Sequence, residues 1–441
     1  MNKPNVKKGK LYFLLLIMLG TLFLLPNFYR NKWKAVDPIY YDEWQIRYDR
    51  LVIARLVKNR QDGFFSAGGF LGLGDVDKWS YQSTVHAHQY DVYLKNDEFQ
   101  SYLIYKSNPG FQGALYGTID IFLNISGESK LVIFRGITAT ASALTIGLIF
   151  ALITIEFGLL AGVFMLIFSA FSIWTVLPAS NIFWNFWIFY LPVFLTISLL
   201  SEKAQQKNRN NKILYSAICL ATTAKILLSG FDLMTTVLIM TTVPVVYYAV
   251  LHRWTWKIFL NHFIKISSAL IIGTTAGLFI MGMQIASVEG QASNSLSYIV
   301  SRIGKHFAGN TEFYADGGIE ATRVGMVELI SKYMLFPAVN LRLPGPDTQI
   351  LYWHIILVFF IFTGLLMINN RNQNETDRKP IALLIATWYS ILAPLSWIII
   401  FRPHSIIHPH VNSMGWQMPF TLLGFALCGY VISILFKRKL S

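Results

Sequence analysis

Long apolar stretches recur along the chain and are separated by polar connections. A helix needs about 20 apolar residues to cross a hydrocarbon core of about 30 Å. Ten stretches approach this length, and they cover residues 10–26, 131–154, 158–178, 183–201, 212–229, 232–251, 262–284, 350–369, 380–401 and 413–436. The pattern therefore predicts an all-α polytopic membrane protein with about ten transmembrane helices.

Two of the connections are long and divide the chain. Neither has the apolar density of a domain with a large core of its own, so we expect helices and loops that lie on the membrane surface. The chain then consists of a signal-anchor helix (1–26), a first outer loop with interfacial helices (27–130), helices two to seven (131–284), a second outer segment (285–349) and helices eight to ten (350–441).

The first outer loop contains one segment with a clear amphipathic pattern, residues 42–58. Apolar side chains recur on one face at helical spacing, and charged or amide side chains fall largely elsewhere. The apolar face carries Trp44, Tyr48, Leu51, Val52 and Leu56, and the polar positions are Gln45, Arg47, Asp49 and Arg50. We predict a helix that rests in the headgroup plane of the membrane.

Basic residues alternate along the short connections and indicate the orientation. They gather near the N-terminus, at the C-terminal end and in three short connections that alternate with the others, whereas the opposite short connections hold only Arg402. The basic connections contain Lys203, Lys207, Arg209 and Lys212, then Arg253 and Lys257, then Arg371, Arg378 and Lys379, and finally Lys437, Arg438 and Lys439. The positive-inside rule therefore predicts that both termini are cytoplasmic. No small-residue cleavage site follows the first apolar stretch, which predicts an uncleaved signal anchor.

Composition supports this class of protein. Hydrophobic residues make up 54% of the chain and charged residues 14%, whereas soluble domains carry about 25% charged residues. The net charge of +14 lies largely in the short connections, so it indicates membrane orientation and not a nucleic-acid partner. Cys219 and Cys428 both lie in apolar stretches, and we expect them to be core residues.

The acidic dipeptide Asp42-Glu43 is the first candidate for chemistry. It stands at the start of the predicted surface helix, about sixteen residues after the first apolar stretch. Acidic residues favour the first turn of a helix, so these carboxylates can serve as caps. The alternative is a general base at the membrane surface, where partial desolvation raises the proton affinity of a carboxylate.

Lys225 and Asp232 are the second candidate. Lys225 lies within a predicted transmembrane helix, where an ionisable residue is a functional hypothesis by default. Asp232 follows seven residues later, two turns along the same face if the helix continues. The pair can be structural, or Lys225 can neutralise a phosphate beside an acidic Asp232.

The third candidate is a segment with one arginine and three histidines, namely Arg402, His404, His408 and His410. We expect it to be a short outer loop that prolines keep from forming a helix. Histidine is a common metal ligand, so a divalent metal stays open as a cofactor, although no carboxylate or cysteine is close in sequence. A site for a lipid phosphate has better support, because arginine forks phosphate oxygens and histidine donates hydrogen bonds. A purely structural loop is the third interpretation.

Weaker candidates share polar or aromatic character and a position on the same predicted side. Such side chains suit carbohydrate or headgroup binding as well as an ordinary membrane interface. They are His86, His88, Tyr90, Asp91, the polar turn 105–113, Asn181, Trp184 and Asn185, with Arg302, Lys305, His306, Arg323 and Arg342 in the second outer segment.

The arrangement resembles the GT-C superfamily of integral-membrane glycosyltransferases, such as the protein O-mannosyltransferases and the bacterial lipid A aminoarabinose transferase. The similarity rests on one N-terminal span, a long first outer loop with an acidic motif near its start, here Asp42-Glu43, and many later spans. It covers most of the chain as topology and only a few residues as motif. The resemblance implies a bacterial inner-membrane enzyme, a polyprenyl-phosphate-linked sugar as donor, and a glycan, lipid or protein acceptor. It also implies that Asp42 is the catalytic carboxylate.

These residues give a consistent reaction scheme. Cations can neutralise the leaving phosphate, so the leaving group needs no proton, and Lys225, Arg402 and His404 are candidates for this role. Asp42 can take the proton of the acceptor hydroxyl, and in-line displacement inverts the anomeric centre. Two alternatives remain: a polymerase or ligase of polyprenyl-linked glycans, and a lipid or solute transporter, which would favour ionisable residues inside the helix bundle.

Overall fold

The chain folds into a bundle of helices with two short antiparallel sheets. The computed structural model describes residues 6–76, 82–201, 211–291, 297–301, 325–341, 348–370 and 378–440. Within these ranges eight helical segments are long and apolar enough to cross a membrane. They are α1 (Val6–Arg30), α5 (Gly127–Phe157), α10 (Asn211–Ser229), α11 (Met234–Leu251), α12 (Trp256–Glu289), α16 (Tyr352–Asn370), α17 (Lys379–Ser390) with α18 (Leu392–Ile400), and α21 (Phe420–Leu440). The predicted polytopic, helical class is confirmed.

The third and fourth predicted spans differ from expectation because each is broken into short helices. They form α6 (Leu159–Phe171) with α7 (Ile173–Ala179), and η3 (Phe186–Tyr190) with α8 (Leu191–Leu200). The first break falls at Ser172, whose extended backbone pairs with Val339 of a distant strand. In the second pair of short helices, Asn185 precedes η3 with a left-handed backbone conformation, and Pro192 stands in the first turn of α8.

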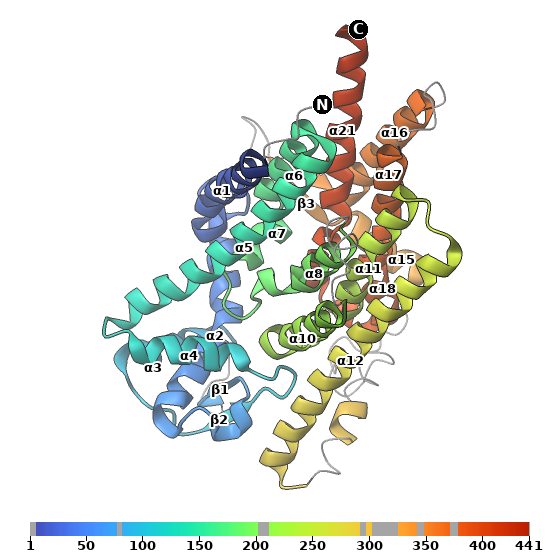
Figure 1. Ribbon diagram of the computed structural model, residues 1–441. Coiled ribbons are helices and arrows are strands. Elements are labelled where there is room, and N and C mark those ends of the chain that lie inside the picture. The colour runs from blue at the N-terminus through green and yellow to red at the C-terminus, as the bar shows by residue number, and fades with distance from the viewer. Residues whose placement is uncertain are drawn as a thin grey trace.

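The two termini lie at one end of the bundle, and the first outer loop lies at the other (Figure 1). That loop contains α2 (Pro38–Asp62), η1 (Ser66–Gly69), β1 (Gly72–Gly74), α3 (Gln82–Lys95), β2 (Tyr102–Ile104) and α4 (Phe111–Phe122). Strands β1 and β2 pair antiparallel. The number of ten spans and the membrane face of the termini stay predictions.

Helix α2 differs from the predicted surface helix in its start. It begins four residues earlier, at Pro38, because Asp37 caps it: the Asp37 carboxylate accepts hydrogen bonds from the backbone of Ile39 at 3.0 Å and Tyr40 at 3.2 Å. Proline is favoured in the first turn because it has no N–H to satisfy. Asp42 and Glu43 therefore lie in the second turn and do not open the helix.

Helix α2 is also buried more completely than a surface helix. Every residue of the stretch 51–57 is buried, and so are Gln45 and Asp49 on the face predicted to be polar. These polar groups are satisfied by protein partners, as buried polar groups must be. Gln45 donates to the Leu177 carbonyl at 2.9 Å and accepts from Asn181 at 3.0 Å. The helix is thus a central element between the outer loop and the bundle.

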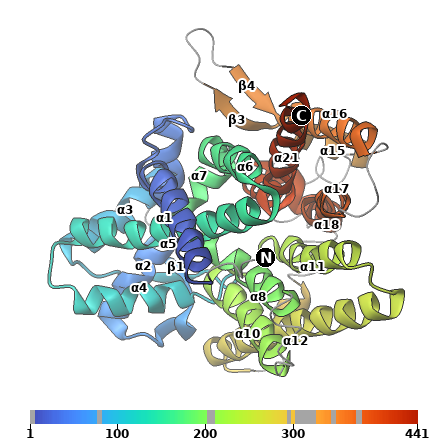
Figure 2. The same ribbon diagram turned by 45° about the horizontal axis from the view of Figure 1, so that its top comes forward.

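The second outer segment is described in part. It contributes α15 (Met326–Met334) and the antiparallel pair β3 (Pro337–Leu341) and β4 (Thr348–Leu351), which Figure 2 shows beside α16. The predicted candidates Arg302, Lys305, His306, Arg323 and Arg342 lie outside the described residues, as do Lys203, Lys207, Arg209 and Arg371.

Candidate functional site

Two cavities flank α2 at the end of the molecule opposite the termini. The large cavity has a volume of about 1050 Å³ and lies among the end of α1, α2, α3 and α5. Its lining consists of Tyr29, Arg30, Tyr41, Asp42, Glu43, Ile46, Arg47, His86, Ala87, Tyr90, Asp91, Glu128, Leu131, Val132 and Arg135. The small cavity has a volume of about 240 Å³, and Arg47 lines both.

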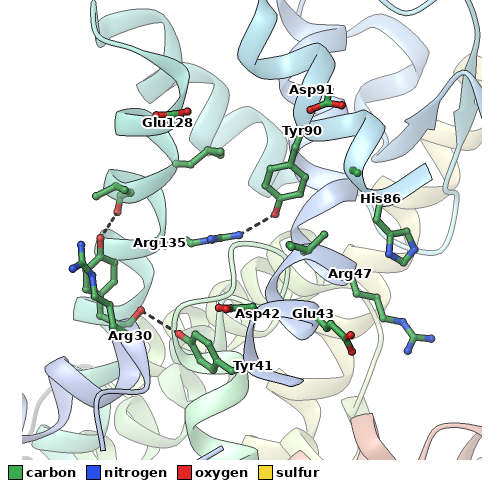
Figure 3. A pocket seen from close by; sticks show the side chains of 15 residues that line it. Arg30, Tyr41, Asp42, Glu43, Arg47, His86, Tyr90, Asp91, Glu128 and Arg135 are labelled. Carbon is green, nitrogen blue, oxygen red and sulfur yellow. Dashed lines mark hydrogen bonds between the residues drawn. The ribbon is translucent and has the colours of Figure 1, made fainter. Parts of the chain in front are cut away.

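The predicted acidic dipeptide lines the large cavity. Asp42 and Glu43 are both exposed. In Figure 3 the Asp42 carboxylate lies on the side of Arg135, whereas Glu43 lies toward Arg47. Adjacent residues on a helix point about 100° apart, which follows from 3.6 residues per turn, so one dipeptide presents carboxylates to two parts of the cavity.

Arg135 is held in the wall of the large cavity by a buried carboxylate. Its Nε donates to Asp49 at 2.8 Å, and one of its terminal nitrogens donates to the Tyr90 hydroxyl at 2.9 Å. Asp49 is fully buried and also accepts a hydrogen bond from the backbone of Ile182 at 2.9 Å. Burial raises the pKa of Tyr90, so the hydroxyl keeps its proton. A buried charge needs such pairing, and the result is a guanidinium of fixed orientation.

The small cavity brings together three predicted site residues from distant parts of the chain. Asp232 lies between α10 and α11, and His404 and His408 lie between α18 and α21; they meet two arginines of α2, Arg47 and Arg50. The remaining lining is Tyr48, Leu51, Leu73, Tyr105, Phe183, Trp184 and Val411. The cavity thus combines two guanidinium groups, two imidazoles and one carboxylate with aromatic walls.

The histidine segment is helical, which corrects the expectation of a loop. It forms α19 (Arg402–Ile407) and α20 (Pro409–Asn412), and a 3₁₀ turn, η4 (Ser413–Gln417), follows. A proline stands in the first turn of each short helix, where its missing N–H costs no hydrogen bond. The prolines therefore start helices here.

The three histidines lie in a row along this segment. Ring centroids are 4.7 Å apart for His404 and His408 and 5.7 Å apart for His408 and His410. Burial lowers the pKa of His410 to about 4, with further lowering from His408 and Arg47. His410 is therefore neutral near pH 7. Among the described residues, no group of three or more His, Cys, Asp or Glu side chains is arranged to hold a metal ion.

Lys225 lines neither of these two cavities. Its side chain is fully buried, and its ammonium group donates to the backbone carbonyls of Gly230 at 2.8 Å and Asp232 at 2.6 Å. The lysine thereby holds the turn that carries Asp232. Arg402 and His410 are also absent from the lining of both cavities.

Several residues of the two cavities were not singled out from the sequence. Arg135 carried a usable signal, because an ionisable residue inside a predicted span indicates function. Arg47 and Arg50 carried none beyond their place on the polar face of a helix. Of the weaker candidates, His86, Tyr90 and Asp91 line the large cavity, and Tyr105 and Trp184 line the small one.

Comparison with known proteins adds no assignment. The chain matches no protein-family model, and neither a curated protein nor a solved structure is significantly similar to it.

Proposed function

We propose that this protein is a membrane glycosyltransferase that moves a sugar from a polyprenyl-phosphate donor to an acceptor at the end of the bundle opposite the termini. The observation that carries the proposal is the pair of cavities that share Arg47. A transfer between two substrates needs cations for a leaving phosphate and a base for an attacking hydroxyl. In this proposal the small cavity supplies the cations, and the large cavity supplies the base.

The small cavity suits the phosphate and sugar of the donor. Arg47 and Arg50 can fork phosphate oxygens, and His404 and His408 can donate hydrogen bonds to them. Preorganised cations stabilise the charge that develops on the leaving phosphate. Asp232 can accept hydrogen bonds from sugar hydroxyls, and Trp184 offers a face for stacking.

The large cavity suits the acceptor. In the proposed step the acceptor oxygen forms a bond to the anomeric carbon, and the bond from that carbon to the phosphate oxygen breaks. The phosphate leaves with the electron pair, and the Asp42 carboxylate takes the proton of the hydroxyl. Displacement from the side opposite the phosphate inverts the anomeric centre. Glu43 also lines the large cavity, where its carboxylate lies toward Arg47 (Figure 3).

Lys225 takes a positioning role in this scheme and does not contact the phosphate. Its two hydrogen bonds to the Gly230 and Asp232 carbonyls fix the turn on which the Asp232 carboxylate stands. Arg402 and His410, which the sequence predicts for the phosphate site, lie outside the lining of both cavities and take no part in this scheme.

Asp42→Asn is the sharpest test. Loss of a general base lowers turnover by about 10²- to 10⁴-fold, so we expect a deletion strain to accumulate a polyprenyl-phosphate sugar, wild-type chain to clear it, and the Asn variant to fail. Lipid mass spectrometry measures the accumulated donor. Asp62→Asn, an exposed carboxylate at the end of the same helix, is the matched control and should clear the lipid. Full clearance by Asp42→Asn would remove Asp42 as base, and no accumulation in the deletion strain would overturn the proposed function.

A further inference from the structure

A third cavity lies inside the membrane-spanning part, toward the end that carries the termini. Its volume is about 180 Å³, and it lies among α5, α8, α11, α17 and the start of α21. The lining is almost entirely apolar: Ile149, Leu152, Ile153, Glu156, Phe157, Tyr190, Val193, Phe194, Ile197, Met240, Val243, Pro244, Tyr247, Tyr248, Leu383, Ala386, Pro419 and Leu423. Figure 2 shows α8 beside α11. The short, broken fourth span leaves room for the cavity here.

The two walls of the cavity differ in exposure. Residues of the inner wall, among them Met240, Leu383 and Ala386, are buried. The lining residues of α8, Val193, Phe194 and Ile197, are half-buried, and so are Ile149 and Leu152 of α5, whereas Ile153 and Phe157 of α5 are buried. The cavity therefore opens to the outside of the bundle between α5 and α8. At this depth the outside is the hydrocarbon of the bilayer, and an apolar cavity does not hold ordered water.

One end of the cavity carries the few polar groups. Glu156, in the last turn of α5, accepts a hydrogen bond from the Tyr247 hydroxyl at 2.9 Å and forms an ion pair with Lys379 at 3.1 Å. Arg378 immediately precedes Lys379 at the start of α17. Arg378 and Lys379 thus bring two basic side chains to the start of α17, of which Lys379 is paired with Glu156, and the N-terminus of this twelve-residue helix adds a partial positive charge.

The length of the cavity fits one leaflet. Its α5 wall runs from Ile149 to Phe157, which is about 12 Å at 1.5 Å per residue. Half of a hydrocarbon core of about 30 Å is about 15 Å. A volume of about 180 Å³ holds only part of a chain that spans one leaflet. One segment of a hydrocarbon chain, with an anionic group at the aqueous boundary, matches the apolar lining and the basic start of α17.

We propose that this cavity binds one acyl chain of an anionic phospholipid from the leaflet on the side of the termini. The chain enters between α5 and α8, and the phosphate lies beside Arg378 and Lys379. This site stands apart from the proposed transferase site and does not depend on it, because its cavity lies toward the opposite end of the bundle.

The test uses the full chain in nanodiscs that contain phosphatidylglycerol with a photoreactive acyl chain. We expect crosslinks on the peptides 149–157 and 190–197. Val193→Trp places an indole at the opening and should lower this crosslinking by about tenfold, equivalent to about 1.4 kcal/mol. Ile356→Trp is the matched control, because Ile356 is equally half-buried on α16 and lines no part of this cavity; it should crosslink like the wild type.

The charge is tested with a second probe. Photoreactive phosphatidylcholine should crosslink about fivefold less than phosphatidylglycerol, the size expected for a partly screened ion pair, and Arg378→Gln with Lys379→Gln should remove the difference. Size-exclusion profiles confirm that each variant is folded, and Ile197→Trp replaces Val193→Trp if the latter aggregates. Unchanged crosslinking in both Trp variants, or equal crosslinking of the two lipids to wild type, would overturn the proposal.

Discussion

Lys225 shows how a buried charge is accommodated by single atoms. Its ammonium group meets two backbone carbonyls of the turn after α10, and the Phe189 ring lies 4.6 Å from its nitrogen. A buried ammonium is stable only with such partners. The lysine therefore belongs to the architecture of the turn that presents Asp232 to the small cavity.

Lys225→Met should destabilise the protein, because the two carbonyls lose their donor while the methionine fills the same space. Each buried acceptor left without a partner costs about 1–3 kcal/mol, so we expect a clear fall in the thermal unfolding temperature in detergent. Lys212→Met, an exposed position on the same helix, should leave it unchanged. Wild-type stability with lost turnover would instead return Lys225 to the phosphate site.

His410 makes stability depend on pH in a defined direction. Its folded-state pKa is about 4, below the ordinary value of about 6.5, so the unfolded chain binds more protons between these values. Stability is therefore present above about pH 6.5 and is lost as the pH falls toward 4. Burial also lowers the pKa of His86 to about 4, so His86 likewise makes the protein less stable as the pH falls from about 6.5 toward 4.

His410→Gln should weaken this pH dependence, since glutamine does not titrate. Unfolding temperatures measured from pH 7 to pH 4 should fall less steeply in the variant than in the wild type, and less steeply still when His86→Gln is added. Identical slopes for all three proteins would contradict the assignment.

Helices α1 and α5 illustrate packing at the scale of elements. Gly20 and Gly147 lie where the two helices meet, and a Cβ at Gly147 would stand 2.7 Å from the Thr21 hydroxyl oxygen and 2.9 Å from the Ile17 carbonyl oxygen. Small residues allow such close approach of membrane helices, where van der Waals packing supplies much of the association energy.

Gly147→Ala should therefore destabilise the protein by about 1–3 kcal/mol through overpacking. Gly136→Ala lies on the same helix with no atom near its added methyl group, and it should be neutral or stabilising by up to about 1 kcal/mol because alanine is the better helix former. Thermal unfolding in detergent measures both. Equal effects of the two substitutions would show that α1 and α5 tolerate a wider separation.

The sequence predicts those helices whose existence depends only on the composition of neighbouring residues. The apolar length of a span is a property of about twenty consecutive residues, and long stretches such as 131–154 were found for that reason. The break at Ser172 depends on pairing with Val339, which is far away in the chain. The burial of Asp49 likewise depends on Arg135 of another helix. Such features need the assembled structure, and the small cavity, built from residues 47 to 411, is of the same kind.

The whole molecule separates its polar chemistry from its termini. Residues of both predicted site regions, Asp42 and the histidines His404 and His408, line the two cavities that flank α2. The first outer loop, which helps to form both cavities, lies at the end opposite the termini (Figure 1). The clustering of the two site regions was predictable from the alternation of basic connections, because spans of similar length place every second connection on one side. The distances between these side chains, and the fact that Arg47 lines both cavities, were not predictable from the sequence.

Cysteine labelling can test the orientation of the molecule. An impermeant maleimide should label Lys95→Cys, in the first outer loop, on intact cells, and it should label Lys437→Cys, near the C-terminus, only after permeabilisation. The positive-inside rule gives this direction. A background without Cys219 and Cys428 removes intrinsic labelling. The reverse pattern would place the termini outside the cytoplasm and move the proposed reaction to the cytoplasmic face.

Arg47 has a thermodynamic consequence because one side chain lines two cavities. A ligand in one cavity can draw the Arg47 guanidinium away from the other cavity. It can also hold the guanidinium in a position that serves ligands in both cavities. The affinity of each ligand then depends on the occupancy of the neighbouring cavity, and linkage requires the two effects to be equal in size. Donor and acceptor affinities measured separately would therefore differ from those measured together by one common factor, and Arg47→Ala would bring that factor to unity.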